Sequence, residues 1–436
     1  MSISRTKFSV NFSSLQYWDV GSTFLTLTNT CGWNAVPLID IVRIRSEEAS
    51  SEEISERRVL LLDRISFDEG KIHAGKKIKT RMKQYKAYKG DIVVSKINAR
   101  KRAIGIVQNS APVCSTIHFR TLIPNAAVVV TKFLWLALRS SYCRNQFEIL
   151  TGGQGKGEIS EARLLQIEVP FPPFSIQHKI VEYWEGTKND VAETKVAKIK
   201  IIDELNKFMI EQTHKYKLLR NSKLFSASFS QAPQWDVKAG RAAVFKEANP
   251  TFIRLGDYTE ECADMIKPWV FPEKKWPIYG VNNKDGVFLS KKQETKDFNA
   301  AYKRIKKGWF FHNPTRANVG SLGIVPDVPE DAITSPEYQV WKITGGFDSE
   351  FMDLLLQTEY FLTLVSFNRV GGVKQRMYYA NLAEIRLPMI AQDIQQRFLV
   401  QKAEIEQKLY NLKKKLIDCK KQVEKLILGT LSVEEL

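Results

Sequence analysis

The sequence predicts an α+β protein in which two pseudo-repeated, mixed α/β domains are separated by two long antiparallel helices that form a coiled coil. Three observations predict this architecture. They are an internal repeat at half the chain length, short β-prone runs in each half, and a regular apolar spacing at the end of each half. With 436 residues, the chain is long enough for two or more hydrophobic cores.

The repeat consists of short matches that occur in one order at an almost constant offset. The Trp-Asp-Val at residues 18–20 recurs at 235–237, an offset of 217. The Gly-Ile-Val at residues 105–107 recurs at 323–325, an offset of 218. Because the matches extend over most of the chain, we expect the two halves to share a fold. The halves differ most in charged and aromatic stretches, which predicts different binding preferences.

Each half begins with short β-prone runs that Gly, Pro and Asn separate. We expect strands at 91–95, 103–107, 309–312 and 322–325. A helical stretch follows in each half, and then a Gly-Gly loop and an apolar strand that ends in proline. The helices are expected at 132–150 and 349–367, and the final strands at 167–170 and 385–388.

A long helix closes each half. The C-terminal helix has the alternating spacing of four and three that is typical of a coiled-coil seam, interrupted only by Lys402. Its seam residues are Phe398, Ile405, Leu409, Leu412, Leu416, Cys419, Val423 and Leu426. The central helix has the equivalent seam, which is weakened by the less apolar residues Thr187, Thr194 and Lys198. The repeat aligns Trp184 of this helix with Lys402 of the C-terminal helix. A second stripe (Ile199, Ile202, Met209, Tyr216) offers contacts to another protein.

Neither helix can bury its seam alone, so we expect the two helices to pair antiparallel within the chain. A rod of roughly 50 Å would then hold the two domains at its opposite ends. The alternative is that each helix packs on its own domain. The first architecture divides the chain into globular domains at 1–171 and 229–389 and helical spacers at 172–228 and 390–436.

The composition indicates the class of partner. The chain has 65 Lys and Arg against 48 Asp and Glu, a formal charge of +17, which favours nucleic acid or an acidic membrane surface. A basic but merely solvated surface is the alternative. The five cysteines are scattered without a Cys-x-x-Cys pair, and neither a signal peptide nor a membrane-spanning run is visible. We therefore expect a cytoplasmic protein.

Two related but diverged basic domains on a rigid spacer suit a split, asymmetric DNA site. Phosphate contacts need Lys and Arg, and base edges are read by Arg or Lys on guanine and by Asn or Gln on adenine. These residue types gather in a loop between two strands of each half and in the two Gly-Gly loops. The candidates are Lys96, Asn98, Arg100, Lys101, Arg102, Gln154 and Lys156 in the first half, and Asn313, Arg316, Asn318, Lys374, Gln375 and Arg376 in the second. For each residue, a solvated surface charge is the alternative.

At these residues the chain resembles the specificity subunits of type I restriction-modification systems. The resemblance is carried by Gly90-Asp91, Ser95-Lys96 and Gly105-Ile106-Val107, and in the second half by Leu255-Gly256-Asp257 and Ser335-Pro336-Glu337-Tyr338. The second half departs from the pattern where Trp309 replaces the aspartate.

The resemblance implies a DNA-binding subunit with two target recognition domains and no catalytic activity of its own. Its implied partners are double-stranded DNA, two methyltransferase subunits that modify adenine, and restriction/translocase subunits. S-adenosylmethionine, ATP and Mg would then be bound by the partner subunits and no cofactor by this chain.

Enzymatic interpretations find less support. The motif Phe171-Pro172-Pro173-Phe174 lacks the polar side chain that an amino methyltransferase places at its first position, and the five histidines are not clustered. The glycine-rich residues 151–157 lack the Lys-Ser/Thr ending of a phosphate-binding loop. A coiled-coil adaptor with two protein- or RNA-binding domains is the remaining alternative.

Overall fold

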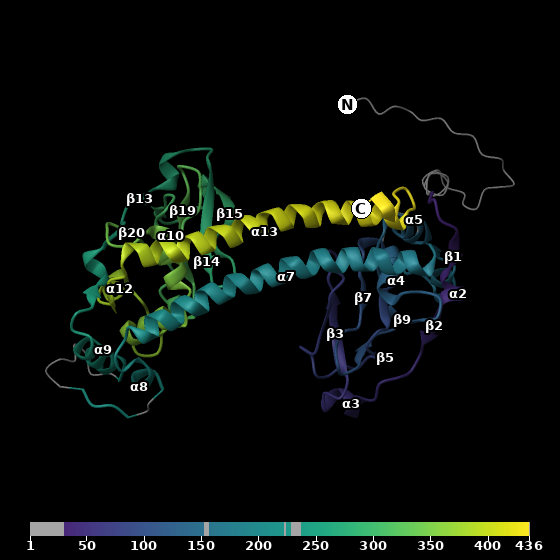
Figure 1. Cartoon of the computed structure of the whole chain (residues 1–436), viewed down its shortest axis with the longest axis horizontal. Helices are drawn as coiled ribbons and strands as arrows, with labels where there is room; N and C mark the ends of the chain where they lie inside the picture. Colours follow the sequence, from purple (N-terminus) through teal and green to yellow (C-terminus); the bar gives the residue numbers. More distant parts are fainter. Residues whose placement is uncertain (1–29, 152–156, 222–223, 228–236, 436) are drawn as a thin grey trace. The chain divides into compact units, whose positions relative to one another are not determined.

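The computed structural model describes residues 30–151, 157–221, 224–227 and 237–435. The chain divides into two compact units (Figure 1). The first unit comprises Met1–Val191 with Asn411–Leu436, and the second comprises Ala192–Tyr410. The boundaries fall inside the two long helices, so each unit contains a part of both.

The described residues of the first unit form three small sheets and five short helices. The two-stranded sheet pairs β1 (Ala35–Pro37) with β10 (Glu168–Pro170). One four-stranded sheet has the order β2 (Val42–Arg45), β9 (Phe119–Pro124), β6 (Ile92–Ser95), β7 (Ile104–Ile106). The other has the order β4 (Ile72–Ala74), β3 (Leu60–Ile65), β8 (Val113–Ser115), β5 (Tyr85–Ala87). The helices are α2 (Leu38–Ile41), α3 (Ser51–Ser55), α4 (Thr131–Leu138), α5 (Ser141–Leu150) and α6 (Glu161–Leu165).

The second unit repeats these sheets in the same order. The two-stranded sheet pairs β11 (Ile253–Arg254) with β21 (Arg386–Leu387). A four-stranded sheet has the order β12 (Thr259–Glu261), β20 (Gln339–Ile343), β17 (Phe310–His312), β18 (Leu322–Ile324). A five-stranded sheet has the order β13 (Met265–Ile266), β16 (Tyr302–Arg304), β19 (Ile333–Thr334), β14 (Lys275–Asn282), β15 (Gly286–Glu294). The helices are α8 (Tyr216–Asn221), α9 (Val237–Ala248), α10 (Ser349–Leu356), α11 (Glu359–Asn368) and α12 (Tyr379–Ala383).

The strand register confirms the predicted repeat. Among the described strands, each unit has one parallel pair, with Leu60 opposite Val113 in the first and Ile278 opposite Ile333 in the second. A parallel pair requires a crossover, so its presence at equivalent positions is a specific sign of shared topology. The second unit adds β13 to this sheet and lengthens the β14–β15 hairpin. The Trp-Asp-Val match itself lies largely outside the described residues, because only Val237 is described.

A glycine with a left-handed backbone precedes the central strand of each unit. Gly90 has φ of 94° and Gly308 has φ of 79°, a region that favours glycine. Their amides donate to the carbonyl oxygens of Val107 and Val325, both at 3.0 Å. The glycine match at offset 218 therefore reflects a shared turn.

The helical stretches predicted at 132–150 and 349–367 are present, and each is divided into two helices. The break in the first unit is at Ser140, whose hydroxyl accepts a hydrogen bond from the amide of Cys143 at 3.4 Å. The break in the second unit is at Thr358, whose hydroxyl accepts from the amide of Phe361 at 3.2 Å. A Ser or Thr in this position satisfies the free amides of a new helix and favours a fresh start.

The long helices are α7 (Phe174–Glu211) and α13 (Gln392–Ile427). In the first unit, the Tyr183 hydroxyl of α7 donates to the Gln422 side chain of α13.

In the second unit, Lys198 of α7 forms an ion pair with Glu406 of α13 at 3.2 Å, and the rings of Phe208 and Phe398 lie 6.3 Å apart. Residue numbers rise along α7 as they fall along α13, so the paired segments are antiparallel. The predicted α+β class with two long packed helices is confirmed.

The seam predicted for these helices is buried or half-buried at every position, including Lys402. The second stripe behaves differently from the prediction. Met209 and Tyr216 are buried in the core of the second unit, so they do not face another protein. Ile199 is exposed, and Ile202 packs partly on the core.

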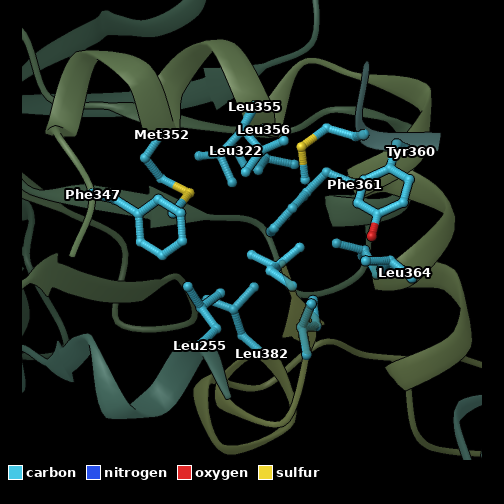
Figure 2. Close-up of a cluster of buried hydrophobic side chains, with 14 of the residues drawn as sticks. Leu255, Leu322, Phe347, Met352, Leu355, Leu356, Tyr360, Phe361, Leu364 and Leu382 are labelled. Carbon is cyan, nitrogen blue, oxygen red and sulfur yellow. The ribbon is translucent and has the colours of Figure 1, made fainter. Parts of the chain in front are cut away.

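The core of the second unit lies between its helices and its sheets (Figure 2). Helices α10 and α11 contribute Met352, Leu355, Phe361 and Leu364, which are fully buried. Burying such a side chain contributes about 1.5–3 kcal/mol relative to exposure. This core supports the sheet from which the candidate DNA-binding loop projects.

All five cysteines are free thiols, and four of them are buried. Burial raises the pKa of the Cys114 and Cys262 thiols to about 11, which makes both unreactive. Within the described ranges, none of the helices combines the length and the apolar character needed to cross a membrane.

Candidate nucleic-acid interface

The candidate loop of the first unit connects β6 to β7 and contains a short 3-10 helix (Ala99–Lys101). The amide of Ser95 donates to the carbonyl of Ala103 at 3.0 Å, and the amide of Lys101 donates to the carbonyl of Asn98 at 2.9 Å. These hydrogen bonds close the loop into a tight turn with a fixed backbone.

The second unit builds the same loop between β17 and β18, with its own 3-10 helix (Ala317–Val319). The amide of Asn313 donates to the carbonyl of Ser321 at 2.9 Å, and the amide of Val319 donates to the carbonyl of Arg316 at 3.1 Å. Each bond matches one of the first unit at an offset of 218. The loop backbone is thus repeated although the side chains differ.

Each loop ends in a residue with a left-handed backbone. This residue is Arg102 in the first unit, with φ of 67°, and Gly320 in the second, with φ of 87°. A residue other than glycine pays about 1–2 kcal/mol for this conformation. Arg139 supports the strained turn, because its guanidinium donates to the carbonyls of Arg102 and Ile104. Burial lowers the pKa of Arg139 to about 10.

The chain that follows each Gly-Gly loop returns to the candidate loop. The amide of Ile159 donates to the carbonyl of Lys96 at 3.2 Å, and the amide of Met377 donates to the carbonyl of Pro314 at 2.9 Å. The two bonds are again related by 218. Gln154 and Lys156, which were predicted to contact DNA, lie outside the described residues.

In the second unit, Arg369 joins the two loops. Its guanidinium donates to the carbonyl of Thr315 at 3.2 Å and to the carbonyl of Gln375 at 2.5 Å. Burial lowers the pKa of Arg369. The only sequence feature that indicates this role is the position of Arg369 two residues before Gly371.

The structure also places His312, which the prediction missed, beneath the loop. Its ring is buried, and its Nε2 lies 2.9 Å from the carbonyl oxygen of Met377. Burial lowers the pKa of His312 to about 4, so the ring is neutral at neutral pH. A neutral, buried histidine here supports the loop backbone and does not contact a ligand.

Two predicted contacts of the first unit are engaged with acidic residues. Lys96 forms an ion pair with Glu158 at 2.6 Å, and only 11% of its side chain is exposed. The hydrogen bond from Lys96 lowers the pKa of Glu158. Arg100 lies 3.7 Å from Glu148 and is half-buried. Lys96 therefore holds the segment that follows the Gly-Gly loop against the candidate loop.

The other predicted residues of this loop differ from Lys96 and Arg100 in their exposure and contacts. Lys101 and Arg102 are exposed, and the ammonium of Lys101 lies 5.9 Å from the centre of the Phe67 ring. Asn98 is half-buried, and its backbone N–H donates to the Ser95 hydroxyl at 3.1 Å. Lys101 and Arg102 are therefore the residues of this loop best placed for phosphate contacts.

In the second unit, three predicted residues lie exposed on the joined loops: Arg316, Lys374 and Arg376. Arg376 lies in an isolated bridge with Val370 and donates to the Tyr378 hydroxyl at 3.3 Å. The bridge and the Arg369 contacts hold together the backbones of the loops that carry these three cations.

The amide side chains of the second unit are already partly engaged. The Asn313 side-chain oxygen accepts hydrogen bonds from the amide of Thr315 at 3.0 Å and from its hydroxyl at 2.8 Å. The Gln375 side-chain oxygen accepts from Lys238. Asn318 is half-buried in the 3-10 helix. Asn313 thus shapes the turn, whereas Asn318 keeps an amide near the loop surface.

In two stretches rich in basic and aromatic residues, 76–88 and 302–307, several lysines are engaged within the domain. Lys86 forms ion pairs with Glu47 at 3.0 Å and with Glu53 at 2.8 Å. In the second stretch, burial lowers the pKa of Lys303, and Lys307 pairs with Asp327 at 3.7 Å. Several of these lysines therefore stabilise the domain surface.

The aspartate that the second half lacks has a structural role in the first. The Asp91 carboxylate accepts hydrogen bonds from the Arg45 side chain at 2.7 Å and from the amide of Tyr88 at 2.8 Å. In the second unit, Trp309 occupies this position, and Lys306 lies 5.3 Å above its ring. A cation–π contact there takes the place of the ion pair.

The arrangement is suited to binding a polyanion. Each unit presents a rigid turn with exposed cations at its rim, and phosphate contacts of this kind fix a protein on DNA. Within the described part of the chain, no three His, Cys, Asp or Glu side chains converge as a metal site.

Comparison with known protein families gives a direct match. Residues 32–204 match the family described as "Type I restriction modification DNA specificity domain". The matched segment contains all described sheets of the first unit and most of α7. No curated protein matches the sequence.

Solved structures show a general likeness. One is the structure reported under "Structural basis underlying complex assembly and conformational transition of the type I R-M system", with 14% identity, TM-score 0.41, and coverage of 91% of this chain and 96% of that chain. The S subunit from M. genitalium shows 16% identity, TM-score 0.41, and coverage of 92% and 97%. The HsdS subunit from Thermoanaerobacter tengcongensis shows 15% identity, TM-score 0.35, and coverage of 93% and 97%.

Proposed function

We propose that the chain is a DNA specificity subunit of a type I restriction-modification system, because residues 32–204 match the family model of such a specificity domain. We further propose that its two units read the two halves of a bipartite, asymmetric DNA site. A specificity subunit is the non-catalytic component of the complex. The proposed target recognition domains are residues 1–171 and 229–389.

One observation carries this proposal: the candidate loop is repeated in backbone but not in side chains. The hydrogen bonds of Ser95 and Lys101 recur at Asn313 and Val319, whereas Arg102 is replaced by Gly320. A fixed backbone presents side chains to the same place on each half-site. Different side chains at that place would select different bases.

The long helices would set the spacing between the two half-sites. Dimeric DNA-binding proteins read half-sites whose separation reflects the protein geometry. We propose that residues 172–228 and 390–436 serve as such a spacer and so determine how many base pairs lie unread between the halves. The antiparallel pairing within each unit supports this role.

The proposed partners are double-stranded DNA, two methyltransferase subunits and restriction/translocase subunits in the cytoplasm. S-adenosylmethionine, ATP and Mg would be bound by these partner subunits. Support comes from apolar side chains that remain exposed on the long helices: Val196, Ile199, Val400, Tyr410 and Ile417. Exposed apolar residues on paired helices are suited to contacts with another protein.

The test is binding of the full chain, alone and with its methyltransferase subunit, to duplex DNA over a range of salt concentrations. Each phosphate contact should add about −0.9 to the slope of log K against log salt. A steep negative slope and co-purification with an adenine methyltransferase would support the proposal. A flat slope, with binding to RNA or protein instead, would contradict it.

A further inference from the structure

Two adjoining cavities lie in the first unit beside the long helices. Their volumes are about 470 Å³ and 560 Å³, and they share Glu69, Trp135 and Lys188 in their walls. Cavities of roughly 300–1,000 Å³ are the usual size for small-molecule ligands. The second cavity also contains Arg102, the residue that ends the candidate DNA-binding loop.

The walls are strongly basic. Eight Lys and Arg side chains line the two cavities, against three Asp and Glu side chains. One of the acids has a structural role. The Glu424 carboxylate accepts a hydrogen bond from the backbone N–H of Ser141 at 2.5 Å, at the start of α5. The cavities therefore carry an excess of positive charge that an anion would balance.

Two tryptophans hold part of this charge in place. The ammonium of Lys132 lies 5.0 Å from the centre of the Trp135 ring, and the ammonium of Lys188 lies 5.6 Å from the Trp184 ring. Such cation–π contacts restrict the lysine side chains and position their charges. Lys132 also lies 3.5 Å from Glu185.

Two further observations indicate a missing anionic partner. The indole N–H of Trp184 is buried and has no hydrogen-bond partner among the described residues. A buried donor without a partner costs about 1–3 kcal/mol. In addition, desolvation and the positive charge of Lys132 lower the pKa of Lys188. An anion in the cavity would stabilise this ammonium group.

The second unit shows that the fold does not require a basic cavity here. At an offset of 218, Trp135 corresponds to Asp353 and Trp184 corresponds to Lys402. These residues face each other as a buried ion pair at 3.9 Å, which Glu350 completes. In the second unit, the charge of Lys402 is therefore balanced by Asp353 and Glu350. The equivalent positions of the first unit hold two tryptophans, and cations are in excess around them.

From these contacts we infer that the first unit binds a phosphate-bearing ligand in the joined cavities, with Lys188 and Lys420 among its cationic contacts. The phosphate belongs either to a free nucleoside phosphate or to the backbone of bound DNA. Both present the same anionic oxygens, and the experiment below separates them. The inference does not depend on the proposed reading of half-sites.

The experiment is calorimetric titration of the full chain with tripolyphosphate, with ATP, and with duplex DNA. The variants are Lys188→Ala and Lys420→Ala, and the matched control is Lys200→Ala, an exposed lysine of α7 outside both cavities. A charge-assisted contact is worth about 1.5–3 kcal/mol, so each cavity variant should weaken tripolyphosphate binding roughly tenfold or more. The thermal midpoint without ligand should not fall, because Lys420 is exposed and the partly desolvated ammonium group of Lys188 lies near the like charge of Lys132.

The DNA titration identifies the source of the phosphate. If tripolyphosphate displaces DNA and the cavity variants weaken DNA binding, the ligand is the DNA backbone. If ATP binding is weakened and DNA binding is not, the ligand is a free nucleoside phosphate. Absence of tripolyphosphate binding at millimolar concentration, or an equal loss in Lys200→Ala, would overturn the inference.

Discussion

The guanidinium of Arg369 donates a hydrogen bond to the carbonyl oxygen of Thr315 at 3.2 Å, and this bond joins two loops that are more than fifty residues apart. Arg369 makes a second bond to the carbonyl of Gln375. The exposed cations Arg316 and Arg376 lie on the two loops that it joins. The arrangement of the candidate interface in the second unit therefore depends on a residue that need not contact DNA.

Replacing Arg369 by alanine should separate these loops. Loss of its hydrogen bonds should lower the free energy of unfolding by about 2 kcal/mol and weaken binding to one half-site only. Urea unfolding measures the first effect, and anisotropy with duplexes altered in each half measures the second. The control is Lys246→Ala, an exposed residue of α9. Equal weakening at both half-sites would contradict the role of Arg369.

Exposed cations and ion-paired cations should contribute differently to the salt dependence of DNA binding. Substituting alanine for Arg316 or Arg376 should reduce the magnitude of the log K against log salt slope by about 1. Substituting alanine for Lys96 should leave this slope unchanged, because Lys96 is paired with Glu158 at 2.6 Å. DNA titration at several salt concentrations checks both outcomes. A slope change in Lys96→Ala as large as in Arg316→Ala would contradict the assignment.

The buried Lys402 should be important for stability. Burial by itself would lower the pKa of Lys402, but the hydrogen bond to Glu350 and the charge of Asp353 raise it. Lys402→Ala leaves Asp353 buried without its cation and should cost about 3 kcal/mol of unfolding free energy. The matched control is Lys198→Ala, which breaks a partly exposed pair with Glu406 and should cost at most about 1 kcal/mol.

The Lys402→Ala protein should regain stability as the pH falls. Burial already raises the pKa of Asp353 in the intact protein, and loss of the cation raises it further. The penalty is present above the ordinary aspartate pKa and is relieved when the buried carboxyl takes up a proton. Unfolding measured at neutral and at mildly acidic pH tests this. A penalty that does not change with pH would show that Asp353 is not the cause.

His312 should make the second unit sensitive to acid. Its pKa is lowered from 6.5 to about 4 by burial, so the folded state resists protonation. Its contribution to stability is complete above pH 6.5 and is lost as the pH falls from 6.5 to about 4, by up to about 3 kcal/mol. His312→Val, which introduces the residue found at the equivalent position 94, should remove this acid loss. An unchanged pH profile in His312→Val would contradict the prediction.

The sequence predicted the repeated fold well, because its signals are local or periodic. Strand runs and the heptad seam depend only on neighbouring residues, so they could be recognised along the chain. The breaks before α5 and α11 were also present in the sequence, as capping residues Ser140 and Thr358. They were missed because the apolar pattern continues through both breaks.

The candidate interface was harder to predict, because charge type alone does not reveal partners. Lys96 is engaged by Glu158, which lies 62 residues later in the chain, and only the folded structure brings them together. The role of Arg369 is hidden for the same reason, since its partners are main-chain carbonyls. Loops could be selected from the sequence, but not the side chains that remain available on them.

The most direct test of two half-sites read by two units is an exchange of one domain. Residues 1–171 would be replaced by the equivalent domain of a related specificity subunit, and methylated adenines would be mapped in cells that also supply the methyltransferase. The account predicts that one half of the methylated site changes, while the other half and the spacing stay the same. A change in both halves, or in neither, would contradict it.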